Sequence, residues 1–139
     1  MRYLLDTTVV SELGKSRPHP VVREWFDRAD DPMLGLSVLV LGELRNGIER
    51  LRRRDPQQAA TLERWLTTVE EGFRDRILGI DSLIAHAWGR LNAAAPLPTV
   101  DGLLAATALV HGLTVVTRDI APFERVGVPW LDPWAYGQP

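Results

Sequence analysis

The sequence contains no cysteine, so the chain can form neither a disulfide nor a thiolate metal site, and oxygen or imidazole must supply any metal ligands. Lysine is almost absent: Lys15 is the single lysine among 16 basic residues. No apolar run approaches the roughly 18 residues of a membrane span, and the segment after Met1 reaches Asp6 too soon for a signal peptide. We therefore expect a cytoplasmic protein in which a hard cation is the first metal to consider.

Length and composition predict a single domain spanning residues 1–139. The chain is 45% hydrophobic, which is ample for one buried core. Its net charge of −2 argues against a basic coat protein for nucleic acid. A local basic cluster of Arg50, Arg52, Arg53 and Arg54 suits phosphate, because guanidinium groups bind phosphate with two donors. A solvated helix end is the other interpretation of this cluster.

Short apolar runs alternate with longer helical patterns along the chain, which is typical of a parallel sheet with crossover helices. The expected strands are residues 3–5, 33–36, 77–80, 113–116 and 126–131. The expected helices are residues 9–15, 20–28, 38–53, 56–73, 82–94 and 100–111. The pattern predicts an α/β fold with a central, mostly parallel sheet.

Two aspartates follow expected strands. Asp6 closes the first strand, and Asp119 lies just beyond the strand that ends near Thr117. In open parallel sheets the functional site lies at the carboxyl ends of the strands, where the strand order reverses. A turn role is the alternative for Asp119, because Asp is a favoured turn residue.

Asp101 opens an expected helix that carries no other charge before His111, so the helix should be buried nearly all round. Leu104, Ala105 and Ala108 share a helical face with Asp101, which predicts a partly buried carboxylate. Capping of the helix is the alternative role, and it is compatible with metal binding.

Glu43 lies at the margin of the apolar stripe of its helix, beside Gly47. We expect Glu43 to be partly buried and Gly47 to permit close approach by another element, because Gly costs about 1 kcal/mol relative to Ala in a helix. An ordinary surface glutamate is the alternative.

Four carboxylates brought together would repel one another and raise their pKa values unless a divalent cation is present. Magnesium prefers oxygen ligands and keeps several waters. It can activate water for attack on phosphorus and stabilise the developing charge. The acids thus predict metal-dependent phosphodiester chemistry.

The sequence resembles the PIN-domain proteins, and among them it is most similar to the VapC-type toxins of toxin–antitoxin pairs. The resemblance rests on five segments in the order and spacing of the family: residues 4–7, 42–47, 101–108, 116–119 and 123–128. The match as a whole extends over nearly the whole chain.

The resemblance implies a three-layer α/β/α fold and an endoribonuclease that depends on Mg²⁺ or Mn²⁺. The residues that match the acidic quartet of the family are Asp6, Glu43, Asp101 and Asp119. It also implies an RNA substrate, a homodimer, and a cognate antitoxin that blocks the site and alone contacts DNA. We expect supporting roles for Thr7, Thr117 and Arg118, with the Thr117 hydroxyl orienting a carboxylate or water and the Arg118 guanidinium contacting a phosphate. An ordinary strand end with an exposed arginine is the other interpretation of Thr117 and Arg118.

The chain departs from the family at Thr8, where relatives usually have Asn. Asn can donate and accept through its amide, so its absence could loosen the surroundings of Asp6. Asp119 stands where many relatives carry Asn.

Two other functions remain open from the residues alone. A phosphotransferase with Asp6 as nucleophile would need a phosphate-engaging lysine, and the chain has only Lys15, no aspartate two residues after Asp6 and no Gly-rich phosphate loop. A catalytically silent module that binds RNA or protein is the second alternative. The presence of all four acids argues against it.

Overall fold

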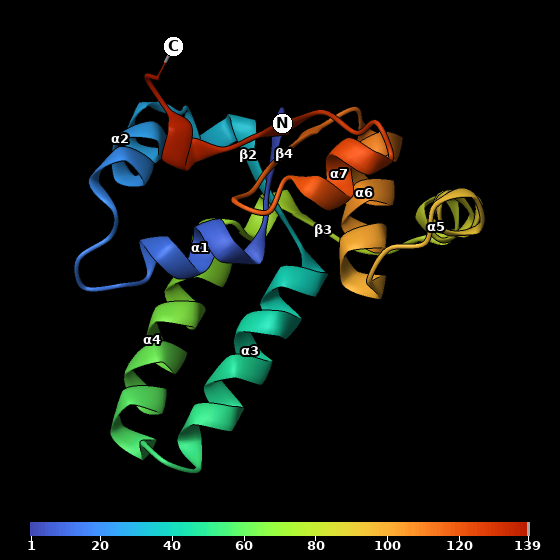
Figure 1. Ribbon diagram of the computed structural model, residues 1–139. Helices are drawn as coiled ribbons and strands as arrows, with labels where there is room; N and C mark the ends of the chain where they lie inside the picture. Colours follow the sequence, from blue (N-terminus) through green and yellow to red (C-terminus); the bar gives the residue numbers. More distant parts are fainter. Residues whose placement is uncertain (139) are drawn as a thin grey trace.

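The computed structural model describes residues 1–138, and its centre is a five-stranded sheet in which all neighbouring strands pair in parallel (Figure 1). The order across the sheet is β3-β2-β1-β4-β5, so the direction of winding reverses between β1 and β4. The strands are β1 (Tyr3–Leu5), β2 (Leu34–Ser37), β3 (Ile77–Leu78), β4 (Thr114–Val116) and β5 (Trp130–Leu131).

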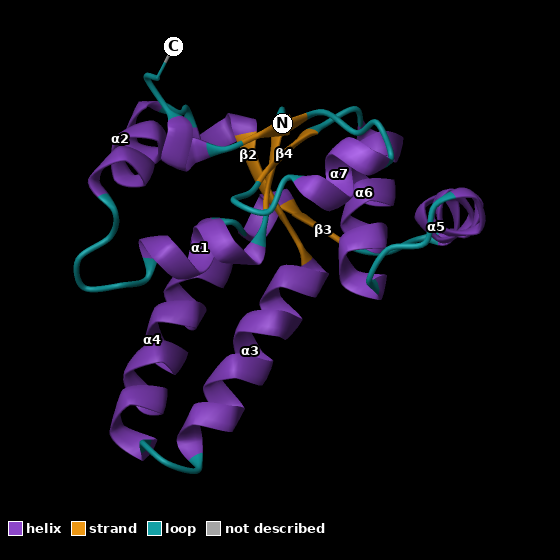
Figure 2. Cartoon of the chain, viewed as in Figure 1, coloured by secondary structure: helices purple, strands orange, loops and turns teal. Residues whose placement is uncertain are grey.

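Helices cover both sides of the sheet: α1 and α2 lie on one side of the strands and α5, α6 and α7 on the other (Figure 2). A long hairpin of α3 and α4 extends away from the sheet (Figure 1). The helices are α1 (Thr7–Leu13), α2 (Pro20–Arg28), α3 (Val38–Arg52), α4 (Pro56–Gly72), α5 (Ser82–Ala94), α6 (Thr99–His111) and α7 (Ala121–Arg125). The predicted three-layer α/β/α architecture is confirmed.

Local chemistry explains where the helices begin and end. Asp6, Ser37, Asp55 and Asp81 each precede a helix and accept a hydrogen bond from a backbone N–H of its first turn. Gly112 ends α6 with a left-handed backbone at φ 66°, which glycine adopts without steric cost.

The structure corrects several predicted boundaries. Helix α1 begins at Thr7 rather than at residue 9, because Asp6 caps it. The third and fifth strands are shorter than predicted, with β3 only Ile77–Leu78 and β5 only Trp130–Leu131. Sequence reasoning missed α7, since five residues are too few to show helical periodicity.

The core lies between the sheet and both helical layers. Its fully buried side chains include Leu4 and Leu5 of β1, Val115 and Val116 of β4, and Phe123 of α7. Burial of each such side chain contributes about 1.5 to 3 kcal/mol. A smaller cluster of Ile84, Ala87 and Ala106 joins α5 to α6. These contacts fix the ends of β1 and β4 relative to the start of α6.

In the part of the chain that the structure describes, no single helix has the length and apolar character to cross a membrane. Helices α5 and α6 would pass such a test only as a pair, across a bend of 120°.

Candidate active site

Asp6 lies at the carboxyl end of β1, beside the reversal of strand order, and is 8% exposed. The Thr7 N–H donates to Asp6 Oδ1 at 2.8 Å. The hydroxyls of Thr117 and Thr8 donate to Asp6 Oδ2 at 2.8 and 3.2 Å. Because all three partners are donors, the carboxylate is held in one orientation as an acceptor.

Thr117 connects the ends of the two central strands. Leu5 and Val116 are paired in the sheet, so the residues that follow them meet at one edge. The fully buried Thr117 hydroxyl donates to Asp6 and accepts from the Asp119 N–H at 3.0 Å. It therefore places the backbone of Asp119 next to Asp6.

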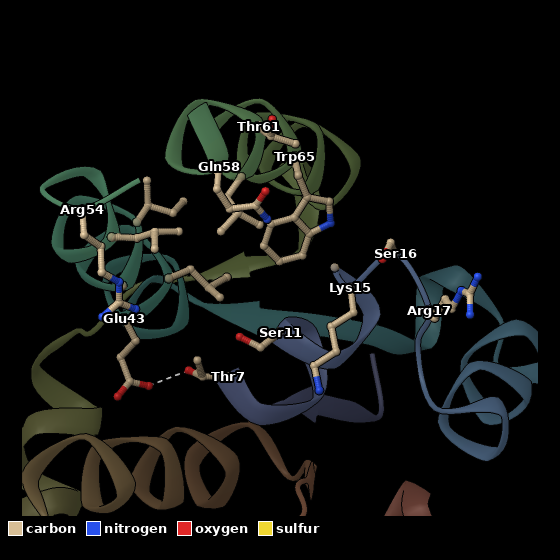
Figure 3. Close-up of a pocket in the computed structure, with 16 residues that line it drawn as sticks. Thr7, Ser11, Lys15, Ser16, Arg17, Glu43, Arg54, Gln58, Thr61 and Trp65 are labelled. Atoms are coloured by element: carbon tan, nitrogen blue, oxygen red, sulfur yellow. Dashed lines mark hydrogen bonds between the residues drawn. The ribbon is translucent and has the colours of Figure 1, made fainter. Parts of the chain in front are cut away.

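Glu43 reaches this site from α3. The Thr7 hydroxyl donates to Glu43 Oε1 at 2.5 Å (Figure 3). The prediction that Glu43 is partly buried was wrong, because its side chain is exposed. The expectation for Gly47 was also wrong: nothing lies within 4 Å of a Cβ built there, and the space beside it is an open groove.

Asp101 lies in the first turn of α6, where Pro98 precedes the helix and no side chain caps it. Burial raises the pKa of Asp101, and the like charges of Asp6, Asp119 and Glu43 raise this pKa further. Capping is thus not what Asp101 does in this fold. The four acids predicted from the sequence lie close enough to interact through their charges.

The carboxylates do not form a closed cage. Among residues 1–138, no three Asp, Glu or His side chains converge closely enough to surround an ion. The four acids instead form an open, acceptor-only site with no imidazole or thiolate. Hard cations that keep part of their water shell suit such a donor set.

The Thr8 hydroxyl both donates and accepts a hydrogen bond, as the amide of an Asn at this position could. Its hydroxyl donates to Asp6 Oδ2 and accepts from the Arg118 N–H at 3.5 Å. The guanidinium of Arg118 does not turn toward the acids but lies over the ring of Trp134, 5.0 Å from its centroid.

A groove of about 940 Å³ leads away from the acidic site, and sequence reasoning missed it. Thr7 and Glu43 line the groove as well as contacting each other (Figure 3). Apolar side chains of α3 and α4 contribute Leu44, Ile48, Leu51, Leu62 and Trp65 to its lining, and basic side chains contribute Lys15, Arg17 and Arg54. The apolar stripe on α3 was the available signal for this groove, because its residues line the groove as well as packing in the core.

The predicted basic cluster is divided. Arg52 pairs with Glu49 at 2.9 Å and with Glu63, Arg54 faces the groove, and Arg50 and Arg53 are exposed. The pairing with Arg52 and Arg45 lowers the pKa of Glu63. Most of the cluster therefore serves the α3–α4 hairpin or faces solvent.

Comparisons with known proteins agree with this geometry. The PIN domain family matches residues 3–129, and the chain belongs to this family. VapC ribonuclease Y4jK of Sinorhizobium fredii is 34% identical, over 94% of this chain and 96% of the relative. Toxin FitB of Neisseria gonorrhoeae is 32% identical, over 94% of this chain and 97% of the relative.

The fold is also similar to a solved structure. The crystal structure of FitAcB from Neisseria gonorrhoeae matches with a TM-score of 0.88 and 32% identity, over 95% of this chain and 98% of the other. The resemblance stated from sequence motifs is confirmed.

Proposed function

We propose that this PIN-domain chain is an endoribonuclease dependent on Mg²⁺ or Mn²⁺ and the toxin of a toxin–antitoxin pair. In this proposal Asp6, Glu43, Asp101 and Asp119 form the metal-binding and catalytic site. The observation that carries it is the convergence of the acids where the sheet order reverses: the Thr117 hydroxyl joins Asp6 to the backbone of Asp119, and Glu43 accepts from Thr7, the neighbour of Asp6. Asp101 lies close enough for the charges of the other three to raise its pKa. Similarity to a VapC ribonuclease and to a toxin supports the reaction and the biological role.

The donor set fits a hard divalent cation. Magnesium binds through one or two carboxylates and keeps several waters, so an open site needs no three-carboxylate cage. Asp6 and Asp101 are the more buried members of the set, whereas Glu43 and Asp119 are exposed. Asp6 and Asp101 would hold the cation, and Glu43 and Asp119 would complete the set of acceptors around it.

The residues of the chain would orient and activate the reactants. A bound cation supplies activation of water and neutralises charge on the phosphoryl oxygens. Asp6 is held for this task by Thr7, Thr8 and Thr117. Glu43 is exposed and accepts from the Thr7 hydroxyl, so it can receive a proton from water at the mouth of the site.

The decisive experiment is RNA cleavage by purified chain, free of partners, in Mg²⁺, in Mn²⁺ and in excess chelator. We expect cleavage only with metal, and loss of at least a hundredfold in Asp6→Asn and Asp101→Asn. Asp31→Asn is the matched control. Asp31 is an exposed acid before β2, so it lies at the amino-terminal ends of the strands, opposite to the acidic site.

The other outcomes separate the alternatives. RNA that is bound but left intact in both metals would indicate a silent binding module. A trapped phosphate on Asp6 would indicate a phosphotransferase. Cleavage that persists in chelator, in a preparation free of other nucleases, would overturn the metal mechanism.

We propose that an antitoxin segment occupies the groove and blocks the site. The groove combines an apolar lining with Lys15, Arg17 and Arg54 and includes Glu43 at the acidic site. An amphipathic segment with acidic side chains toward the three basic residues, and a basic one toward Glu43, would complement it. In Arg54→Glu, which reverses the charge of an exposed residue of the groove, we expect RNA cleavage to persist while the antitoxin inhibits it more weakly.

We further propose a homodimer and a cytoplasmic location for this chain, whose residues 1–139 we treat as one domain. Exposed apolar side chains, notably Leu83 at 66% and Leu109 at 55% exposure, offer surface for association. Light scattering of wild type and Leu109→Glu tests the dimer. A monomer at high concentration in both would contradict it.

A further inference from the structure

Arg118 lies between two residues of the acidic site but is held outside it. Its neighbours in the chain are Thr117, which donates to Asp6, and Asp119. The Arg118 N–H donates to the Thr8 hydroxyl, which fixes the backbone beside Asp6. The side chain turns away, and its Cζ lies 5.0 Å from the centroid of the Trp134 ring.

Arg118 has no acidic partner within the described chain. In residues 1–138 the guanidinium forms no ion pair, although four acids lie close by. The side chain is exposed. Stacking on an indole occupies one face of a guanidinium and leaves its five in-plane N–H donors free.

Trp134 is itself held firmly. It packs against the main core, and its backbone N–H donates to Asp132 Oδ1 at 2.9 Å. The preceding Pro133 is buried, and the short segment Pro133–Ala135 contacts α2. Trp134 is partly buried and Arg118 is exposed, so the guanidinium lies over a ring that is anchored in the core while its edge remains open to solvent.

We propose that Arg118 binds a phosphate of the RNA beside the scissile bond, and that Trp134 is a positioning residue that holds Arg118 for this contact. The proposal rests on the proposed ribonuclease function. An acidic site repels an RNA backbone, and an unpaired guanidinium one residue from Asp119 supplies the opposite charge at its border. The planar fork binds phosphate through two N–H donors without any dependence on base sequence.

The test measures binding of a fluorescent 20-nucleotide oligo(rU) in chelator, where cleavage is absent, at several salt concentrations. We expect Arg118→Ala to raise Kd about tenfold at low salt. The slope of log Kd against log salt should fall by about 0.7, the value for one phosphate contact on a single strand. Arg118→Lys should keep the slope but bind more weakly than wild type.

Arg2→Ala is the matched control. Arg2 is also exposed, forms no ion pair in the described chain and lies over an aromatic ring, that of Tyr3 at 5.2 Å. Arg2 precedes β1 and Asp6 follows it, so the two residues lie at opposite ends of this strand. The two substitutions remove the same charge, but Arg2→Ala should leave Kd and the salt slope unchanged.

A double-mutant comparison tests the role of Trp134. Trp134→Leu should raise Kd about threefold, and Trp134→Phe, which retains an aromatic face, should restore most of the affinity. Arg118→Ala/Trp134→Leu should bind like Arg118→Ala alone, because Trp134 acts through Arg118. If Trp134→Leu does not fold, Trp134→Met, which keeps bulk without an aromatic face, replaces it in the same comparison.

An unchanged salt slope in Arg118→Ala, or an equal loss in Arg2→Ala, would overturn the phosphate contact while metal-dependent cleavage by wild type stands. Additive losses in the double variant would overturn the positioning role. If wild type neither binds nor cleaves RNA, both this inference and the proposed function fail.

Discussion

Thr117 and Asp6 are 111 residues apart in the chain, yet the Thr117 hydroxyl donates to Asp6 Oδ2 at 2.8 Å in the interior of the protein. The same hydroxyl accepts from the Asp119 N–H. One buried oxygen therefore joins the first strand, the fourth strand and the loop that carries a second acid. The arrangement makes Thr117 a structural link between two members of the acidic site.

We predict that Thr117→Val weakens metal binding more than it weakens the fold. Partners that orient a metal-binding carboxylate are worth about 10- to 100-fold in affinity. The apparent Kd for Mg²⁺, measured by thermal shift, should rise by that factor, and stability in chelator should fall by about 1 kcal/mol. Thr107→Val is the control, because the buried Thr107 hydroxyl bonds only to the Leu103 carbonyl of its own helix. Equal effects of both substitutions on Mg²⁺ binding would contradict the prediction.

Thr8 should tolerate Asn but not Val. The Thr8 hydroxyl donates to Asp6 and accepts from the Arg118 N–H, and an Asn amide can do both. Thr8→Asn should keep cleavage within about threefold of wild type, while Thr8→Val should lower kcat/KM about tenfold. Steady-state cleavage rates provide the comparison, and a fully active Thr8→Val would show that this hydroxyl is dispensable.

Asp101→Asn should stabilise the protein in chelator at neutral pH. Burial and three like charges raise the pKa of Asp101 in the folded state above its value in the unfolded chain. The folded state then binds more protons, so Asp101 lowers the free energy of unfolding as pH rises through the folded pKa. The variant should melt higher than wild type at pH 7 and equally near pH 3, where both states of wild type are protonated.

At neutral pH, magnesium should make wild type melt at a higher temperature than Asp101→Asn. At a hundredfold excess over Kd, it should stabilise wild type by about 2.7 kcal/mol and the variant by much less. Asp101 is better suited to this test than Asp6, which accepts three hydrogen bonds and would lose them on substitution. A variant that melts lower than wild type in chelator would show that Asp101 supports the fold.

Glu12→Gln should destabilise the protein at neutral pH. The nearly buried Glu12 carboxylate accepts from Lys15 Nζ at 2.8 Å and from the His19 N–H at 3.0 Å, and these bonds lower the pKa of Glu12. Its stabilisation is present above the unfolded pKa and is lost as pH falls through the folded pKa. Urea unfolding should show a loss of about 1 to 2 kcal/mol at pH 7 that shrinks below pH 4. Glu70→Gln on the exposed surface of α4 should show no such loss.

Helices with a long periodic pattern were predicted more closely than most short elements: β3 and β5 were predicted too long, and α7 was missed. Helices α2 and α5 were predicted to the residue, because an apolar stripe and a capping or proline residue mark each of them. Helix α7 and the two-residue strands β3 and β5 depend on pairing and burial against distant segments. Local propensity does not encode such contacts.

The sequence by itself determined the four acids, the absence of softer metal ligands, the strand ends at which Asp6 and Asp119 lie and the helix start at which Asp101 lies. Only the tertiary structure decided that Glu43 is exposed, that Thr8 replaces both functions of an Asn, and that Arg118 turns from the acids to Trp134. The physical reason is the range of the interactions. Periodicity and capping act within about four residues of the chain, whereas the site depends on side chains that meet only after the parallel strands have paired.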